Sequence, residues 1–181
     1  VSIGISSDEK YYFINSSDHN TSEQYYFKTN EKKPIPKLIQ KREKGILYSV
    51  NSWDGTFYMH TNKNAEDFKI EKTNNRNFDK WETFIPPKSE TLIGGLTFLK
   101  NWIIRTEVSN ALGKIFVKNL KTNKEEEIIF SEERVYDGGV SLIQKDKNTD
   151  LIYISYSTPK TQSRVYLYNL KTKEKKLVKE Q

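Results

Sequence analysis

The chain has 181 residues, of which 30 are Lys or Arg and 24 are Asp or Glu, so its formal net charge is +6. It contains no cysteine, which excludes disulfides and thiolate metal sites, and no run approaches the roughly 18 apolar residues that a membrane span requires. Only five of the basic residues are Arg, and acidic runs interrupt the lysines, so the charge pattern does not favour nucleic-acid binding.

The first quarter of the chain contains four short apolar runs that predict β-strands. They are rich in Tyr, Phe, Ile and Val, and polar turn-forming residues separate them. The runs are Val1–Ile5, Tyr11–Ile14, Tyr25–Phe27 and Lys37–Ile39.

The second quarter repeats this arrangement and adds a turn signal. Its runs are Gly45–Val50, Phe57–Met59, Phe68–Ile70 and Thr83–Ile85. Asp54-Gly55 lies between the first two runs, and such a pair favours a tight hairpin because Gly tolerates a positive φ. We therefore expect Gly55 to turn the chain between two antiparallel strands.

The last two quarters continue the pattern and contain an internal repeat. Their runs are Thr91–Leu96, Trp102–Ile104, Ile115–Val117, Ile128–Phe130, Gly138–Ile143, Leu151–Ile154, Val165–Leu167 and Lys176–Val178. The tetrapeptide Asn-Leu-Lys-Thr at 119–122 returns 50 residues later at 169–172, between the third and fourth runs of its unit. A repeat of this length is typical of propellers and solenoids.

Four strands in each of four units predict an all-β chain, a partial β-propeller of about four four-stranded antiparallel blades. No window of eleven residues has helical apolar spacing without a strand breaker inside it. We place the blades approximately at 1–43, 44–88, 89–132 and 133–181. The pairs Gly94-Gly95 and Gly138-Gly139 are expected where first strands crowd near a propeller axis, with a bulge or a turn as the alternative.

Catalytic chemistry is not indicated by the residues. His19 and His60 have no His, Cys or carboxylate cluster at metal-ligand spacing, so we expect no metal site and no cofactor. Ser6 and Ser141 lack the second Gly of a nucleophile elbow. The turn residues Asp8, Asp54 and Asp150 are expected to cap the backbone, so we expect no catalytic residue in this chain.

Several ordered motifs resemble the propeller of oligopeptidase B (protease II), a group within the prolyl oligopeptidase family of serine peptidases. The stretch Phe57–Ile70 has the aromatic strand, the Thr-Asn-x-x-Ala turn and the following Phe of that group. Further matches occur at 21–23, 81–86, 157–159 and 176–181, so the resemblance covers essentially the whole chain. The departures are Asp67, where the family often has Asn, and Gly113, which interrupts the third unit.

The resemblance implies a division of labour between two domains. In the family, a seven-bladed propeller caps an α/β-hydrolase domain with a Ser, Asp and His triad, and the oligopeptidase B group cuts short peptides after Lys or Arg. This chain would correspond to the last four blades, without a hydrolase domain. We therefore expect it to be inactive alone. Val1 and the single Met59 lead us to expect a truncated start.

Three interpretations stay open at this point. The chain is the propeller portion of such a peptidase, as a split-gene product, a remnant or an excised fragment; a protein-binding propeller arc; or an unrelated enzyme. Its expected partners are a separate α/β-hydrolase chain or a second copy bound through open blade faces, with a peptide substrate only in the complete enzyme. No nucleic acid or membrane is expected, and the lack of cysteine is compatible with a reducing cytoplasm. The residues expected on the open faces are Tyr12, Ile14, Tyr26, Tyr153, Tyr166 and Tyr168.

Overall fold

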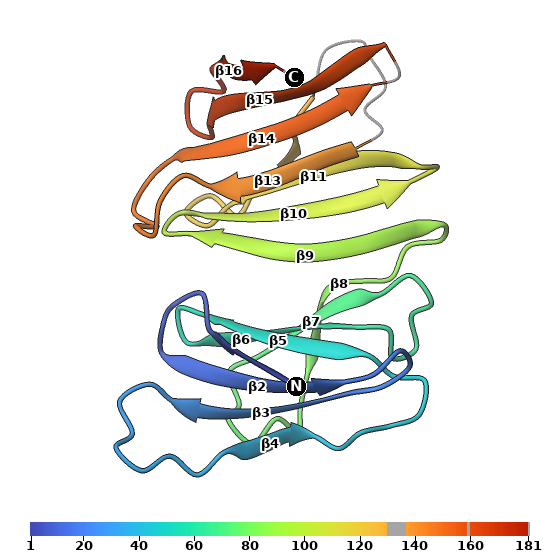
Figure 1. Ribbon diagram of the computed structural model, residues 1–181, viewed down its shortest axis with the longest axis vertical. Coiled ribbons are helices and arrows are strands. Elements are labelled where there is room, and N and C mark those ends of the chain that lie inside the picture. The colour runs from blue at the N-terminus through green and yellow to red at the C-terminus, as the bar shows by residue number, and fades with distance from the viewer. Residues whose placement is uncertain (130–136, 159, 181) are drawn as a thin grey trace. The chain divides into compact units, whose positions relative to one another are not determined.

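The computed structural model describes residues 1–129, 137–158 and 160–180, and its regular structure is entirely β (Figure 1). These described residues form sixteen strands and no helix, so none of them provides a helix suited to crossing a membrane. The strands form four four-stranded antiparallel sheets, as predicted. The chain divides into two compact units, Val1–Ser89 and Glu90–Gln181.

Unit 1 contains two sheets in which consecutive strands are neighbours. The first sheet consists of β1 (Ser2–Ile5), β2 (Tyr11–Ser17), β3 (Ser22–Lys28) and β4 (Lys37–Gln40). The second consists of β5 (Tyr48–Trp53), β6 (Thr56–Thr61), β7 (Lys69–Thr73) and β8 (Glu82–Ile85). Asp54 and Gly55 join β5 to β6 with φ angles of 48° and 80°, which confirms the predicted hairpin.

An aromatic core lies between the two sheets of unit 1. Strand alternation directs Tyr11 and Phe13 of β2 and Tyr26 of β3 into this core. The ring of Phe57 lies 5.0 Å from the rings of both Tyr11 and Phe78. The expectation that Tyr26 lies on an open blade face is therefore wrong, because it is only 8% exposed and packs inside.

Unit 2 has the same sheet topology. Its first sheet consists of β9 (Thr91–Leu99), β10 (Trp102–Ser109), β11 (Leu112–Asn119) and β12 (Glu125–Glu127). The second consists of β13 (Asp137–Leu142), β14 (Leu151–Thr158), β15 (Thr161–Asn169) and β16 (Lys175–Glu180).

A second core joins the two sheets of unit 2. Ile104 and Ile115 from one sheet pack with Ile152 and Ile154 from the other, and all four are almost fully buried. Tyr166 and Tyr168 pack against this core, so the expectation that they lie on an open face is also wrong. Tyr166 pairs with Ile154 and Tyr168 pairs with Ile152. Because paired residues project from the same side of a sheet, the tyrosines lie on the same side as these buried isoleucines.

The fourth strand of the third sheet is displaced from its predicted position. β12 consists of three glutamates and pairs Glu127 with Phe116, whereas the prediction placed this strand at 128–130. Ile128 belongs to the core, whereas Ile129 is 70% exposed. The apolar run therefore does not form the strand, because the chain leaves its pairing with β11 after Glu127 and turns Ile128 into the core. Phe130, Pro159 and Gln181 lie outside the described residues, as does the expected blade boundary at 132/133.

Two strands of the second sheet start later than predicted. Phe68 has a φ of 67° and its amide donates to the carbonyl of Ala65, so it belongs to a turn and β7 begins at Lys69. Gly45 has a φ of 82° and lies in the turn before β5. Both residues precede their strands because a left-handed residue cannot continue an extended one.

The two glycine pairs have different roles. Opposite Thr106, the register between β9 and β10 shifts, so that Gly94 and Gly95 face a single residue in a β-bulge. A Cβ on Gly94 would lie 2.7 Å from the carbonyl oxygen of Thr106, whereas one on Gly95 would meet no atom within 4 Å. Gly138 and Gly139 lie in regular register with β14. The bulge that was expected as an alternative therefore occurs only at Gly94 and Gly95.

Candidate functional site

A polar groove lies between the two sheets of unit 1, beside the first strand of each. Its volume is about 370 Å³, and β1, β2, β3 and β5 supply its walls. β1 and β5 each pair with one neighbour, so each has a backbone edge that faces away from its sheet. The lining includes amide and hydroxyl side chains, namely those of Asn15, Gln24, Ser49 and Asn51.

Side chains of β3 satisfy the backbone of β5 along this groove. Gln24 accepts a hydrogen bond from the amide of Val50 at 2.7 Å and donates to Asn15 Oδ1 at 2.6 Å. Ser22 Oγ donates to the carbonyl of Tyr48 at 2.9 Å and accepts from the amide of Tyr48 at 2.6 Å. These contacts replace the ladder that a neighbouring strand would provide, and they hold the groove in one shape.

Tyr48 crosses from β5 to the strands of the first sheet. Its hydroxyl donates to the carbonyl of Gln40 at 2.7 Å and accepts from the amides of Gln24 and Gln40 at 2.9 and 3.2 Å. Burial raises the pKa of Tyr48, and the two amide donors oppose that shift without cancelling it. The phenol is therefore neutral near pH 7 and acts as a fixed hydrogen-bonding group.

A hydroxyl and carboxylate cluster closes the turn after β1. Ser6 Oγ donates to Asp8 Oδ1 at 2.7 Å and accepts from the amides of Lys10 and Tyr11 at 3.1 and 3.0 Å. Ser52 Oγ donates to the second oxygen of Asp8 at 2.8 Å. The Ser6 hydroxyl is engaged in holding the turn, and no histidine takes part in these bonds, so this arrangement lacks an activated nucleophile.

The other residues considered in the sequence are dispersed. His19 lies exposed between β2 and β3, and His60 in β6 stacks on Phe68 with ring centroids 4.5 Å apart. Asp150 accepts the indole N–H of Trp102 at 2.7 Å. Ser141 is exposed in β13. Among the described residues, no three His, Cys, Asp or Glu side chains form a group that could hold a metal ion.

Sequence reasoning did not identify Gln24 and Tyr48 as groove residues. One signal was available, because Ser22 and Gln24 alternate with Tyr26 on the core-facing side of β3. A buried amide at such a position requires hydrogen-bond partners, and here they come from β5 and from Asn15 in β2. The groove can therefore present neutral amide and hydroxyl groups and the Glu23 carboxylate to a peptide-like ligand, but no histidine is among its lining residues.

Comparison with known proteins identifies the architecture. The family model described as the N-terminal β-propeller domain of prolyl oligopeptidase matches residues 1–181. A dipeptidyl aminopeptidase BI from Pseudoxanthomonas mexicana is 23% identical over 100% of this chain and 25% of its own length. Protease 2 from Moraxella lacunata is 24% identical over 96% of this chain and 24% of its own length. The chain thus spans about a quarter of these curated relatives.

Solved structures share the fold over nearly the full chain. Oligopeptidase B from Trypanosoma brucei, in a closed form with covalently bound antipain, matches with a TM-score of 0.87 and 23% identity. That match covers 99% of this chain and 27% of the other. Oligopeptidase B from Leishmania major matches with a TM-score of 0.82 and 14% identity, over 99% of this chain and 27% of the other. The predicted partial β-propeller is confirmed.

Proposed function

Because the chain belongs to the prolyl oligopeptidase family through its N-terminal β-propeller domain, we propose that it is the substrate-gating propeller portion of an oligopeptidase B-like serine peptidase. The complete enzyme would cleave short peptides after basic residues. The observation that carries this proposal is the similarity to oligopeptidase B along 99% of the chain. The two curated relatives carry names of different peptidase activities, so the preference for basic residues is part of the proposal.

The groove of unit 1 fits a gating role better than a catalytic one. Its amide and hydroxyl side chains can form hydrogen bonds with the backbone of a passing peptide, but they do not supply the groups that cleave it. The hydrogen bonds of Gln24 and Tyr48 keep the shape of the groove fixed. The Ser, Asp and His triad would lie in a hydrolase domain, either on a separate chain or elsewhere in a longer one. We place the complete enzyme in the cytoplasm, in keeping with a chain that contains no cysteine.

The proposal is tested by adding back a catalytic part. The 181-residue chain alone should hydrolyse neither a short nor a long peptide that contains Arg or Lys. A hydrolase-domain chain of the same family should gain activity and a preference for the short peptide when this chain is added. Hydrolysis by the propeller chain alone that survives repurification would contradict the assignment, as would an added hydrolase whose size preference does not change.

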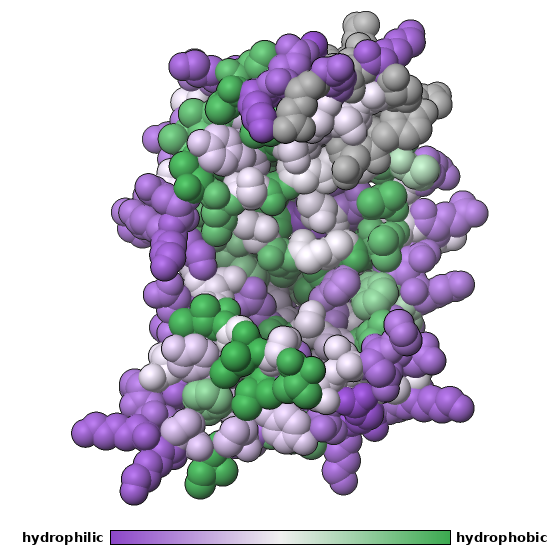
Figure 2. All heavy atoms as spheres, viewed as in Figure 1, coloured by the Kyte–Doolittle hydropathy of each residue, from purple (hydrophilic) through white to green (hydrophobic). Residues whose placement is uncertain are grey.

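One exposed surface favours a second candidate function, that of a protein-binding propeller arc. The face of the first sheet opposite its core contains Ile3 paired with Ile14, and Ile5 paired with Tyr12, which in turn pairs with Phe27. Ile3 and Ile5 are 63% and 51% exposed. Figure 2 shows apolar residues at the surface beside the N-terminus marked in Figure 1. A face of this kind promotes association with a complementary surface, including that of a second copy.

Light scattering distinguishes this candidate from a monomeric chain. Self-association should be reduced by Ile3→Lys, which places a charge on the apolar face, and should persist in Ile35→Lys. Ile35 is a matched control because it is 77% exposed in the loop between β3 and β4. A wild-type chain that stays monomeric and binds no hydrophobic dye would reject self-association through this face.

A further inference from the structure

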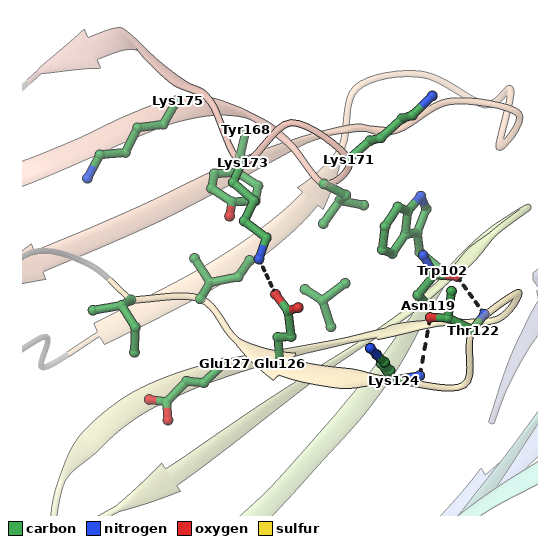
Figure 3. Close-up of a pocket in the computed structure, with 14 residues that line it drawn as sticks. Trp102, Asn119, Thr122, Lys124, Glu126, Glu127, Tyr168, Lys171, Lys173 and Lys175 are labelled. Carbon is green, nitrogen blue, oxygen red and sulfur yellow. Dashed lines mark hydrogen bonds and ion pairs between the residues drawn. The ribbon is translucent and has the colours of Figure 1, made fainter.

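Unit 2 contains a hollow of about 490 Å³ whose walls come from both of its sheets (Figure 3). One wall is formed by β10, β11, β12 and the turn between β11 and β12, and the other by β15, β16 and the turn between them. This volume falls within the range of roughly 300–1,000 Å³ that is usual for small-molecule sites. None of the groove residues described above lies in it.

The floor of the hollow is apolar. Trp102, Val117, Ile128 and Leu170 line it, and all four belong to the buried core of unit 2. The indole N–H of Trp102 is already bonded to Asp150 at 2.7 Å, so its ring offers only apolar surface to a ligand. A ligand seated here would need an apolar body that covers these side chains.

The repeated Asn-Leu-Lys-Thr segments build the two turns at the opening. Asn119 Oδ1 accepts from the amides of Lys121 and Thr122 at 2.9 and 3.2 Å. Asn169 Oδ1 accepts from Lys171 and Thr172 at 2.9 and 3.0 Å. Each turn then passes through a left-handed residue, at Asn123 and Lys173, with φ angles of 59° and 64°. The repeat therefore has a structural role, and the turns that contain it place Lys124 from one sheet and Lys171 from the other at the same hollow.

The rim of the hollow has an excess of positive charge. It carries four lysines and two glutamates, namely Lys124, Lys171, Lys173, Lys175, Glu126 and Glu127. Lys173 Nζ forms an ion pair with Glu126 at 2.6 Å, and Lys175 Nζ lies 5.5 Å from the ring centroid of Tyr166. In Figure 3, Lys124 lies at the turn between β11 and β12, while Lys171 stands at the margin with its side chain directed away from the hollow.

We propose that this hollow binds a small apolar carboxylate, such as the C-terminal residue of a peptide or a free aromatic acid. The carboxylate would lie at the opening beside Lys124, where Lys171 would turn inward from the margin to meet it, and the apolar body would cover Trp102 and Leu170. A lysine that meets a carboxylate forms a charge-assisted hydrogen bond, which is stronger than a neutral one. The proposal does not depend on the peptidase assignment, because it rests on unit 2 alone.

Tyr168 lines the end of the hollow beside Lys173 and carries no charge. Burial raises the pKa of Tyr168, Lys173 lowers it and Glu126 raises it, and the net direction is upward. The phenol therefore keeps its proton near pH 7. Its ring lines the hollow beside Lys173, at the end away from Lys124 and Lys171, so it adds apolar surface and a neutral hydroxyl to that end (Figure 3).

Calorimetric titration of the intact chain with N-acetylphenylalanine tests the proposal. This probe carries the carboxylate and the apolar ring of a peptide C-terminus, and saturable binding is expected. N-acetylphenylalanine amide, which lacks the charge, and acetate or inorganic phosphate, which lack the ring, should each bind at least about tenfold more weakly. Tighter binding of N-acetylphenylalanine than of 3-phenylpropionate would indicate a peptide terminus as the source, and equal binding a free acid.

Paired substitutions locate the binding on the protein. Lys124→Met with Lys171→Met should weaken binding of N-acetylphenylalanine by roughly tenfold or more, because each Met keeps an apolar stem and removes a charge. Lys100→Met with Lys145→Met makes the same change in net charge at exposed positions of unit 2 outside the hollow, and should leave binding unchanged. Ile129→Ser, at a rim position that is 70% exposed, should weaken binding without unfolding the chain.

Three results would overturn the proposal. The first is the absence of saturable binding to the wild-type chain. The second is equal binding of the acid and its amide, or of N-acetylphenylalanine and phosphate. The third is a Lys124→Met and Lys171→Met variant that keeps wild-type circular dichroism and wild-type affinity.

Discussion

Arg105 and Glu107 form a buried ion pair in β10. Arg105 Nε donates to Glu107 Oε1 at 2.8 Å, and the two side chains are 4% and 3% exposed. The other two guanidinium nitrogens donate to Glu125 at 2.8 and 3.0 Å, and the guanidinium carbon lies 4.6 Å from the ring centroid of Phe116. Burial lowers the pKa of Arg105, but Glu125 and Glu107 outweigh that effect, so the guanidinium remains charged.

Arg105→Met should lower the free energy of unfolding by about 3–5 kcal/mol, because it leaves the Glu107 carboxylate buried without its cation. Urea unfolding followed by circular dichroism measures the loss. The control is Arg164→Met, which removes an exposed ion pair with Glu180 and should have a far smaller effect. Equal losses in the two variants would show that burial of the Arg105 pair has no energetic consequence.

Tyr48→Phe should destabilise the chain by about 1–3 kcal/mol at neutral pH, because it removes the acceptor for the buried Gln24 amide and the part-buried Gln40 amide, and the donor to the Gln40 carbonyl. Thermal and urea unfolding measure this loss. Tyr12→Phe is the control, since Tyr12 is half-buried and packs by its ring, 5.3 Å from that of Phe27. If both substitutions cost the same, the hydroxyl of Tyr48 is not a structural link between the sheets.

The stabilisation that Tyr48 provides should decrease at alkaline pH. Its pKa in the folded chain lies above the ordinary value of 10.0, so the unfolded chain releases this proton first as the pH rises. The difference in unfolding free energy between wild type and Tyr48→Phe should be constant below about pH 10 and shrink as the pH rises toward the folded-state pKa. Unfolding curves recorded from pH 7 to 11 check this, and a difference that grows above pH 10 would contradict it.

Gly94→Ala should destabilise the chain by about 1–3 kcal/mol, because the added Cβ would collide with backbone atoms of Thr106 in the bulge. Gly95→Ala provides a matched control in the adjacent residue, where a Cβ would meet nothing within 4 Å. That substitution should be neutral or slightly stabilising, since it restricts the unfolded chain. Chemical denaturation that ranks the two variants in the reverse order would refute this account of the bulge.

Gly55→Val should destabilise the chain by at least about 1–2 kcal/mol, because a β-branched residue is strained at a φ of 80°. No atom lies within 4 Å of the position that its Cβ would take, so the effect comes from the backbone and not from a collision. Lys121→Ala, at an exposed turn position, is the control and should leave the melting temperature nearly unchanged. Coinciding melts would argue against backbone strain at this turn.

The sequence by itself determined that most of the chain is extended, and it determined the hairpin between β5 and β6. Alternating aromatic and aliphatic residues specify an extended chain, and Asp54-Gly55 specifies a turn with positive φ, because both preferences arise from neighbouring residues. The resemblance of ordered motifs in the sequence also led to the correct family.

Tertiary structure decided which side of each strand is buried and where β12 pairs. Tyr26 and Tyr166 were expected outside, but each contacts a core between neighbouring sheets, and only those sheets determine the buried side. Three glutamates form β12 in place of the apolar run because their register with β11 brings Glu125 to Arg105 and Ile128 into the core. Local sequence fixes an extended conformation, whereas register and burial depend on residues that are distant along the chain and meet only in the folded state.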